Sequence, residues 1–296
     1  DYYASRGLGD VYKRQKLYWI YTTISAKPSQ QFQNWKKKAR KSNMKVITIA
    51  NQKGGVGKTT TATALASILN ENGYNTLLID CDTQCNSTDT YGAKSEGVAT
   101  IYDVLLEDER IEDAVQHTEN GDILAGDYLL RQADEKLKDN VNGLYRLADA
   151  LDSVENYDYV ILDTAPVLNS VLFNCLICSD EVIIPVLTDR YSINGLSLLN
   201  DTIKAVKKRQ NPKLSVTGLL LTMYNGQTRL SRETKSALED IAVAMNTKVF
   251  HTTIRRSTKC QEAQAQKKML IRYAPRSTTA EDYSCLLYTS PSPRDA

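Results

Sequence analysis

The chain has 296 residues, of which 42% are hydrophobic and 24% charged, and its formal net charge is +2. This composition suffices for one large α/β domain or two small ones, and no apolar stretch is long enough to cross a bilayer. Six cysteines are few for this length, which disfavours a disulfide framework and favours a reduced, cytoplasmic protein.

The charge is unevenly distributed along the chain. Residues 1–43 carry ten Lys or Arg and two Asp or Glu, whereas residues 285–296 carry one of each. Residues 44–284 therefore have a net charge of −6. Because the excess positive charge lies at one end, the overall charge indicates no partner.

Both ends of the sequence resemble translated adapter DNA. With suitable codons, residues 5–15 and residues 285–295 can be encoded by complementary strands of one DNA that looks like a sequencing adapter. We expect these two peptides to be artefacts of sequence assembly, and residues 16–43 to be upstream sequence read through before a start at Met44, so that residues 1–43 and 285–296 lie outside the fold. One domain is then expected over residues 44–284.

A phosphate-binding loop is predicted near the start of this domain. Residues 46–50 are a short apolar run typical of a buried strand, and residues 62–69 place apolar side chains at helical spacing. The sequence KGGVGKTT stands between them at residues 53–60. In this order of strand, glycine-rich loop and helix, backbone N–H groups surround phosphate oxygens. Lys58 is expected to reach the β- and γ-phosphates, and the Thr59 hydroxyl to bind Mg²⁺.

The loop departs from the ordinary pattern G-x-x-x-x-G-K-[ST]. Gln52 stands at the first glycine position, and an additional lysine, Lys53, follows it. The sequence K-G-G-x-G-K-T-T resembles the deviant Walker A motif of the ParA/MinD superfamily of ATPases. The resemblance implies that Lys53 reaches the nucleotide of the partner subunit in an ATP-dependent homodimer. The loop residues expected to bind nucleotide are Lys53, Gly54, Gly55, Val56, Gly57, Lys58, Thr59 and Thr60.

A second apolar run, residues 76–80, predicts a buried strand that ends in an acidic segment. Carboxylates at the carboxyl end of such a strand can act on Mg²⁺ through water or orient an attacking water. The segment DCDTQ resembles the superfamily's D-x-D-P-Q, in which the second acid positions the hydrolytic water. The resemblance assigns that role to Asp82, and Thr83 stands at the proline. The expected catalytic residues are Lys53, Lys58 and Asp82.

The middle of the chain contains a second acidic motif. Residues 86–143 predict only a short helix at 100–106, a strand at 121–125 and an amphipathic helix at 129–137. The apolar run YVILD then ends at Asp163, as in a Walker B strand whose acid helps to hold Mg²⁺. The expected metal ligands are Thr59, Asp82 and Asp163.

Further strands are predicted at residues 180–186 and 216–223, with a helix over residues 193–206 between them. This helix ends in a basic run that includes Lys204, Lys207 and Lys208. The repeated alternation of strand and helix predicts an α/β fold with a doubly wound, mostly parallel sheet, as in P-loop NTPases.

The C-terminal third is basic. Between residues 248 and 276 there are eight Lys or Arg and one acid, Glu262. Such clusters are typical of phosphate-backbone binding, although a solvated surface is the alternative. The resemblance also places Arg256 near the adenine pocket. The residues expected to bind DNA are Arg229, Arg232, Lys248, Arg255, Arg256, Lys259, Lys267, Lys268 and Arg272.

The resemblance covers residues 44–283 and implies a ParA-type ATPase of DNA segregation. Its expected cofactors are ATP and Mg²⁺, and its expected partners are non-specific double-stranded DNA and a ParB-like centromere-binding protein that stimulates slow hydrolysis. The expected location is the cytoplasm, at the nucleoid, with no membrane involved.

Three alternatives remain open at this point. A MinD-like ATPase that cycles on the membrane would carry an amphipathic helix beyond residue 284. An iron–sulfur reductase of the same superfamily is disfavoured because Cys175 and Cys178 lie close together in an apolar segment. A nucleotide-gated scaffold without turnover is disfavoured by Asp82. The cysteines at 81, 85, 175 and 178 could also be read as two metal-binding pairs, but buried apolar cysteines are the preferred interpretation.

Overall fold

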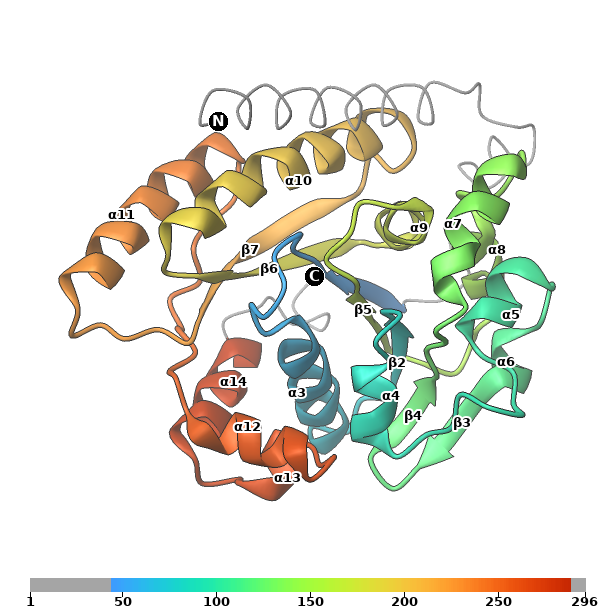
Figure 1. The fold of residues 1–296 in the computed structure, drawn as a ribbon, viewed down its shortest axis with the longest axis horizontal. Helices are drawn as coiled ribbons and strands as arrows, with labels where there is room; N and C mark the ends of the chain where they lie inside the picture. The colour runs from blue at the N-terminus through green and yellow to red at the C-terminus, as the bar shows by residue number, and fades with distance from the viewer. Residues whose placement is uncertain (1–43, 289–296) are drawn as a thin grey trace, which may run out of the picture.

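Seven strands form one sheet in the computed structural model, which describes residues 44–288, with only the backbone for residues 190–194 and 287–288 (Figure 1). The strand order is β3-β4-β2-β5-β1-β6-β7, and every neighbouring pair is parallel except β3 and β4. The strands are β1 (Lys45–Ile49), β2 (Thr76–Cys81), β3 (Val115–Thr118), β4 (Gly121–Leu124), β5 (Tyr159–Thr164), β6 (Glu181–Leu187) and β7 (Ser215–Thr222). This arrangement confirms the predicted doubly wound, mostly parallel α/β sheet.

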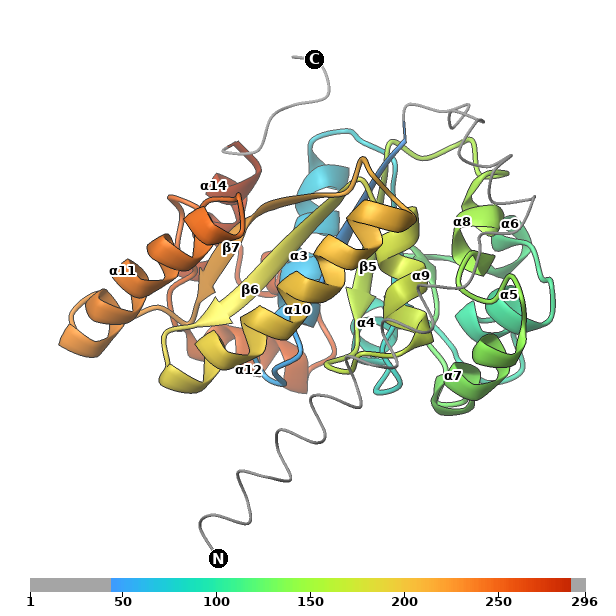
Figure 2. The same cartoon turned by 90° about the horizontal axis from the view of Figure 1, so that it is seen from above.

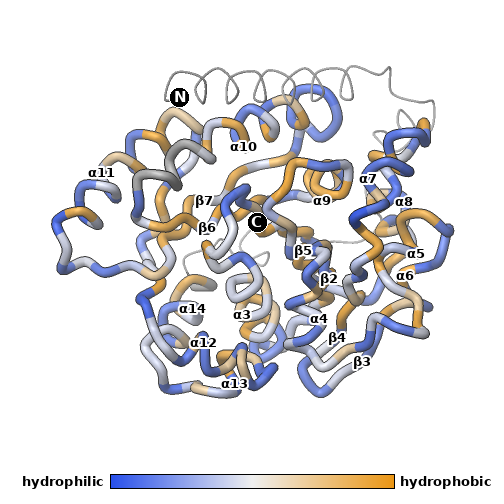
Figure 3. Tube along the Cα trace, viewed as in Figure 1, coloured by the Kyte–Doolittle hydropathy of each residue, from blue (hydrophilic) through white to orange (hydrophobic). Residues whose placement is uncertain are grey.

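The central strands are hydrophobic on both faces. All six residues of β2 and all six of β5 are buried. Neighbouring residues in a strand point to opposite faces, so Val46 contributes to one apolar cluster and Ile47 to the other. Figure 3 shows the same pattern as hydrophobic colour concentrated on β5, β6 and α9. Near-continuous apolar runs of this kind are typical of parallel strands covered on both sides.

Helices cover the two faces of the sheet. Helices α9, α10 and α11 lie on one face, and α3 with α12, α13 and α14 lies on the other (Figures 1 and 2). The helices are α3 (Lys58–Glu71), α4 (Asn86–Tyr91), α5 (Ile101–Leu106), α6 (Ile111–Ala114), α7 (Leu130–Asp139), α8 (Arg146–Leu151), α9 (Ser170–Cys178), α10 (Arg190–Arg209), α11 (Arg229–Ala244), α12 (Thr258–Ala265), α13 (Leu270–Tyr273) and α14 (Thr278–Tyr288).

Strand β1 lies at the point where the sheet reverses its winding direction. It pairs with β5 on one side and with β6 on the other. In open α/β sheets, the crevice beyond the carboxyl ends of the strands at this reversal is where ligands bind. The segment that follows β1 is the predicted phosphate loop, so the fold places this loop at the expected position.

Strand β4 confirms the strand predicted at residues 121–125, whereas β3 and its antiparallel pairing with β4 were not predicted. Strand β3 has four residues and none of them is fully buried, so its hydrophobic pattern is weak. The dipeptide Asn120-Gly121 at the turn is a typical hairpin signal, and Gly121 has φ +117°.

At the far end of the chain, α14 continues through residues 285–288, and Leu286 is buried in the same cluster as α3. The proposed boundary at residue 284 stays a prediction, and the predicted artefacts at residues 1–43 lie outside the described part of the chain.

Gly218 in β7 packs closely against the ring of Phe250. A Cβ at this position would lie 2.6 Å from a ring carbon of Phe250, which is buried and has little room to move. We therefore expect Gly218→Ala to lower the free energy of unfolding by about 1–3 kcal/mol, measured by urea denaturation. The matched control is Gly195→Ala in α10, where a Cβ meets no atom within 4 Å. Equal stability of the two variants would contradict this packing.

Candidate functional site

The loop between β1 and α3 is held in place by hydrogen bonds to two other strands, β7 and β6. Gly55 and Gly57 have φ of +71° and +87°, a conformation that favours glycine. The Thr222 hydroxyl, at the end of β7, donates to the carbonyl of Val56 at 2.7 Å. Asn51 donates to the carbonyl of Pro185 at 2.6 Å in β6 and accepts from a loop N–H. No side chain caps the N-terminus of α3, which leaves its first N–H groups available to an anion.

Two lysines of the loop have different surroundings. The Lys58 side chain is buried, and its Nζ donates to the carbonyl of Lys53 at 3.3 Å. Burial lowers the pKa of Lys58, and the nearby carboxylates of Asp163 and Asp82 oppose that shift. The Lys53 ammonium instead forms an ion pair with Asp189, just beyond β6 of the same protomer. The structure therefore places Lys58 inside the site and Lys53 at its rim.

Asp163 is the carboxylate at the centre of the site. It is 1% exposed, and burial together with the charge of Asp80 raises its pKa to about 7. The Ser87 hydroxyl donates to its Oδ2 at 2.8 Å, and the Thr59 hydroxyl also lowers the pKa of Asp163. Its Oδ1 is buried and has no hydrogen-bond partner. The predicted metal ligands Thr59, Asp82 and Asp163 thus lie around one point, with one carboxylate oxygen left without a donor.

Asp80 has a structural function that the sequence did not indicate. Its fully buried carboxylate accepts hydrogen bonds from the N–H and hydroxyl of Thr88, at 2.9 and 2.8 Å, and from the N–H of Asp82 at 3.1 Å. Burial raises the pKa of Asp80 to about 6. The Thr88 hydroxyl also accepts from the N–H of Gly126 at 2.8 Å. Asp80 therefore fixes the turn that carries Asp82.

These residues fit a magnesium ion. Mg²⁺ prefers oxygen ligands and is commonly held by one or two carboxylates together with substrate phosphates and water. The unpartnered Oδ1 of Asp163 beside the Thr59 hydroxyl is the kind of buried oxygen that a cation satisfies. Within residues 44–288, no group of three or more His, Cys, Asp or Glu could hold a metal by itself. The donor set therefore suits an ion shared with a phosphate ligand better than a protein-only metal site.

The cysteines do not form the two metal-binding pairs considered above. Cys81 and Cys175 are buried and their thiols contact each other, which together with burial raises the pKa of Cys81. Cys178 donates to the backbone carbonyl of Cys175 at 3.3 Å. Burial raises the pKa of Cys85 to about 11. Cys81, Cys175 and Cys178 are therefore buried packing residues, and Cys85 is partly buried.

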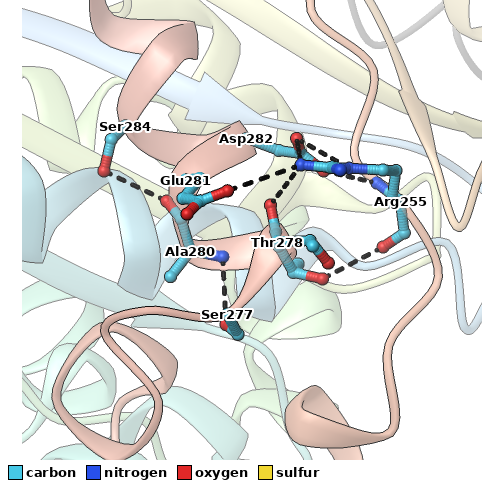
Figure 4. A network of polar contacts seen from close by, with 8 residues as sticks. Arg255, Ser277, Thr278, Ala280, Glu281, Asp282 and Ser284 are labelled. Atoms are coloured by element: carbon cyan, nitrogen blue, oxygen red, sulfur yellow. Dashed lines mark hydrogen bonds and ion pairs between the residues drawn. The ribbon is translucent and has the colours of Figure 1, made fainter.

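Several of the predicted DNA-binding residues are engaged by other groups. The Arg255 guanidinium forms an ion pair with Asp282 at 2.7 Å and donates to the carbonyl of Thr278 at 3.1 Å (Figure 4). The N–H of Arg255 also donates to Asp282 at 2.9 Å. Arg255 therefore ties the segment before α12 to the C-terminal helix α14, a structural role that the sequence reasoning missed.

Others are paired with acids or carbonyls nearby. The ion pairs are Arg229 with Glu233 at 2.6 Å, Lys259 with Glu262 at 2.7 Å and Lys267 with Asp89 at 3.1 Å. Arg232 and Arg272 donate to loop carbonyls, and the Lys248 ammonium lies 5.7 Å from the centre of the Phe250 ring. Arg256 and Lys268 are exposed. The cations are spread over α11, at the left of Figure 1, and over the region of α12 and α13 at the bottom.

Helix α12 borders the nucleotide site. The Gln264 side chain donates to the Thr60 hydroxyl at 3.2 Å, at the start of α3. The Tyr283 hydroxyl in α14 lies 3.1 Å from the Thr61 hydroxyl. The segment that carries Arg256 is therefore adjacent to the first turn of α3, and the adenine contact expected of Arg256 stays a prediction.

None of the helices in residues 44–288 has the length and apolar character needed to cross a membrane.

Comparison with known proteins gives consistent results. A family model described as an AAA domain matches residues 44–216. The sporulation initiation inhibitor protein Soj of Bacillus subtilis is 38% identical over 243 residues, which cover 81% of this chain and 95% of Soj. A plasmid partition protein of Borrelia burgdorferi, solved with AMPPNP, has a TM-score of 0.71 and 28% identity, covering 83% of this chain and 97% of that one. Cobyrinic acid a,c-diamide synthase of Mycobacterium smegmatis, solved with ADP and magnesium, has a TM-score of 0.71 and 29% identity, covering 81% and 91%.

Ser87 provides a test of the metal site. Its hydroxyl holds Oδ2 of Asp163, so Ser87→Ala should let the carboxylate rotate and should weaken Mg²⁺ binding about tenfold. The measurement is a Mg²⁺ titration of the binding of a fluorescent ATP analogue. Thr90→Ala in the same helix is the matched control, because its hydroxyl donates only to the Asn86 carbonyl. An unchanged Mg²⁺ requirement in Ser87→Ala would contradict this role.

Proposed function

Since the chain belongs to the Soj/ParA family of partitioning proteins, we propose that it is a Mg²⁺-dependent ATPase that acts in DNA segregation. The observation that carries the proposal is the meeting of the phosphate loop with Lys58, Asp163 and Asp82 at the carboxyl ends of β1, β5 and β2. The nucleotides in the Borrelia and Mycobacterium structures support ATP, and the magnesium in the latter supports Mg²⁺.

In the proposed hydrolysis, some residues bind the phosphates and another orients the attacking water. The N–H groups of the loop and of the first turn of α3 bind the phosphate oxygens, and Lys58 neutralises their charge. Thr59 and Asp163 would hold Mg²⁺, which when bound would spread the charge of the β- and γ-phosphates. Asp82, whose Oδ1 accepts from the N–H of Gln84 at 3.0 Å, orients the water that attacks the γ-phosphorus. The products are ADP and inorganic phosphate.

The ion pair of Lys53 bears on the proposed dimer. In this protomer Lys53 is bound to Asp189, so it must leave this carboxylate before it can contact a nucleotide on a partner subunit. We infer that ATP-driven dimerisation exchanges an ion pair within the protomer for one between Lys53 and the partner's phosphates. Such an exchange would make the two states close in free energy, as a switch requires.

The finer parts of the proposal concern the partners. The ATP-bound dimer would bind double-stranded DNA without regard to sequence, and a ParB-like protein would stimulate hydrolysis and so release the dimer. The names of Soj and of the Borrelia plasmid partition protein support a role in partition. The proposed location is the cytoplasm, at the nucleoid.

The test is retention on immobilised duplex DNA of arbitrary sequence. We expect the protein to be retained with ATP but not with ADP, and retention to fall steeply with salt because phosphate contacts release counterions. Asp82→Ala should slow phosphate release about 100-fold and prolong retention, since the ATP-bound state persists.

Asp89→Ala is the matched control for hydrolysis, because Asp89 is an exposed carboxylate that pairs with Lys267 outside the site. Equal retention with ATP and ADP would contradict the segregation proposal. Hydrolysis at the wild-type rate in Asp82→Ala would remove Asp82 from the mechanism.

A further inference from the structure

The C-terminal end of α10 carries positive charge that neither the nucleotide site nor the predicted DNA-binding residues include. Between residues 195 and 213 the one acidic residue is Asp201. The four lysines of this segment are exposed, and within the described part of the chain none of them has an ion pair or hydrogen bond through its ammonium group. This α10 basic end consists of Lys204, Lys207, Lys208 and Lys213.

Helix stability alone does not account for this cluster. Cations in the last turn of a helix stabilise it through the helix dipole, and Lys207 and Lys208 lie there. Lys204, however, lies one turn earlier, three residues before Lys207 and four before Lys208, and like charges at these spacings destabilise a helix. Lys213 lies beyond the helix end. The arrangement therefore concentrates repulsion that a bound polyanion would relieve.

Several cations of the C-terminal third, unlike the lysines of the α10 basic end, are paired with carboxylates. There, Arg229, Arg255, Lys259 and Lys267 each have a carboxylate within 3.1 Å. A carboxylate beside a cation repels an approaching phosphate and competes for the cation. The lysines of the α10 basic end differ from these four paired cations because no carboxylate neutralises them, and in the C-terminal third Arg256 and Lys268 are likewise exposed without an ion pair among the described residues.

We propose that the α10 basic end binds the phosphate backbone of duplex DNA, an inference that rests on the proposed function. Helix α10 follows β6 and precedes β7, so its C-terminal end lies at the amino ends of these parallel strands. The phosphate loop follows the carboxyl end of β1, at the opposite edge of the sheet. DNA bound there would leave the loop, and any dimer contact around Lys53, accessible.

The surroundings favour DNA over a membrane surface. Helices that lie in a membrane interface present large apolar side chains beside their lysines. The exposed large hydrophobic residues of the described chain include none between residues 195 and 222. An ammonium is a point charge that binds phosphate without reading bases, which suits contact that is independent of sequence.

The experiment measures ATP-dependent binding of the full chain to a duplex of arbitrary sequence over a range of salt concentrations. The variant is Lys207→Gln with Lys208→Gln, and the matched control is Lys94→Gln with Arg131→Gln, two exposed cations elsewhere with the same loss of charge. Thermal melting verifies that both variants fold. We expect the α10 variant to bind at least about tenfold more weakly at 0.1 M salt, with a salt slope smaller by about 2, while the control binds like the wild type.

The possible results separate the two proposals. If the wild type binds DNA and the α10 variant binds equally well, the α10 basic end is not the DNA contact, although the proposed function stands. If the wild type shows no ATP-dependent DNA binding, both proposals fail. If it binds vesicles of phosphatidylserine and phosphatidylcholine instead, and the α10 variant does not, DNA is the wrong partner for this surface.

Discussion

A buried carboxylate beside a buried lysine is the interaction on which the site depends. Asp163 and Asp80 lie side by side on β5 and β2. Burial and the charge of Asp80 raise the pKa of Asp163 to about 7, and burial together with the charge of Asp82 raises the pKa of Asp80 to about 6. Lys58 is the cation of the phosphate loop that faces this negative charge, and its own burial lowers its pKa. The protein alone therefore leaves the site incompletely neutralised, and a divalent cation with a phosphate ligand would complete it.

The sheet creates this site by register. Asp80 and Asp163 are direct partners in the β2–β5 ladder, so two strands far apart in sequence end at the same height. Strand β1 pairs with β5 along its whole length, which brings the loop and Lys58 to the same edge. Because parallel strands are joined by helical crossovers, the edge that carries the site is formed only by strand ends and loops. The position of the charged residues in the site thus depends on the strand order and register of the sheet as well as on the phosphate-loop motif.

The features of the structure that depend on a local sequence pattern could be predicted from the sequence. The buried strands, the glycine loop before α3 and the acids at residues 82 and 163 were all recognisable, because each lies within a few residues of its own signal. The hydrogen bond from Ser87 to Asp163 and the pairing of Arg255 with Asp282 join residues 76 and 27 positions apart, so no local pattern indicates them. The basic C-terminal third appeared uniform in sequence, but the structure shows that acids neutralise several of its cations.

The measurement that tests the site most directly is calorimetric titration of the protein with ATP, with and without Mg²⁺. Saturable binding that strengthens when Mg²⁺ is present, and that is lost in Lys58→Ala, is the result expected of a phosphate loop coupled to the Asp163 carboxylate. Binding by Lys58→Ala with an affinity near that of the wild type, or binding indifferent to Mg²⁺, would contradict the assignment of this site.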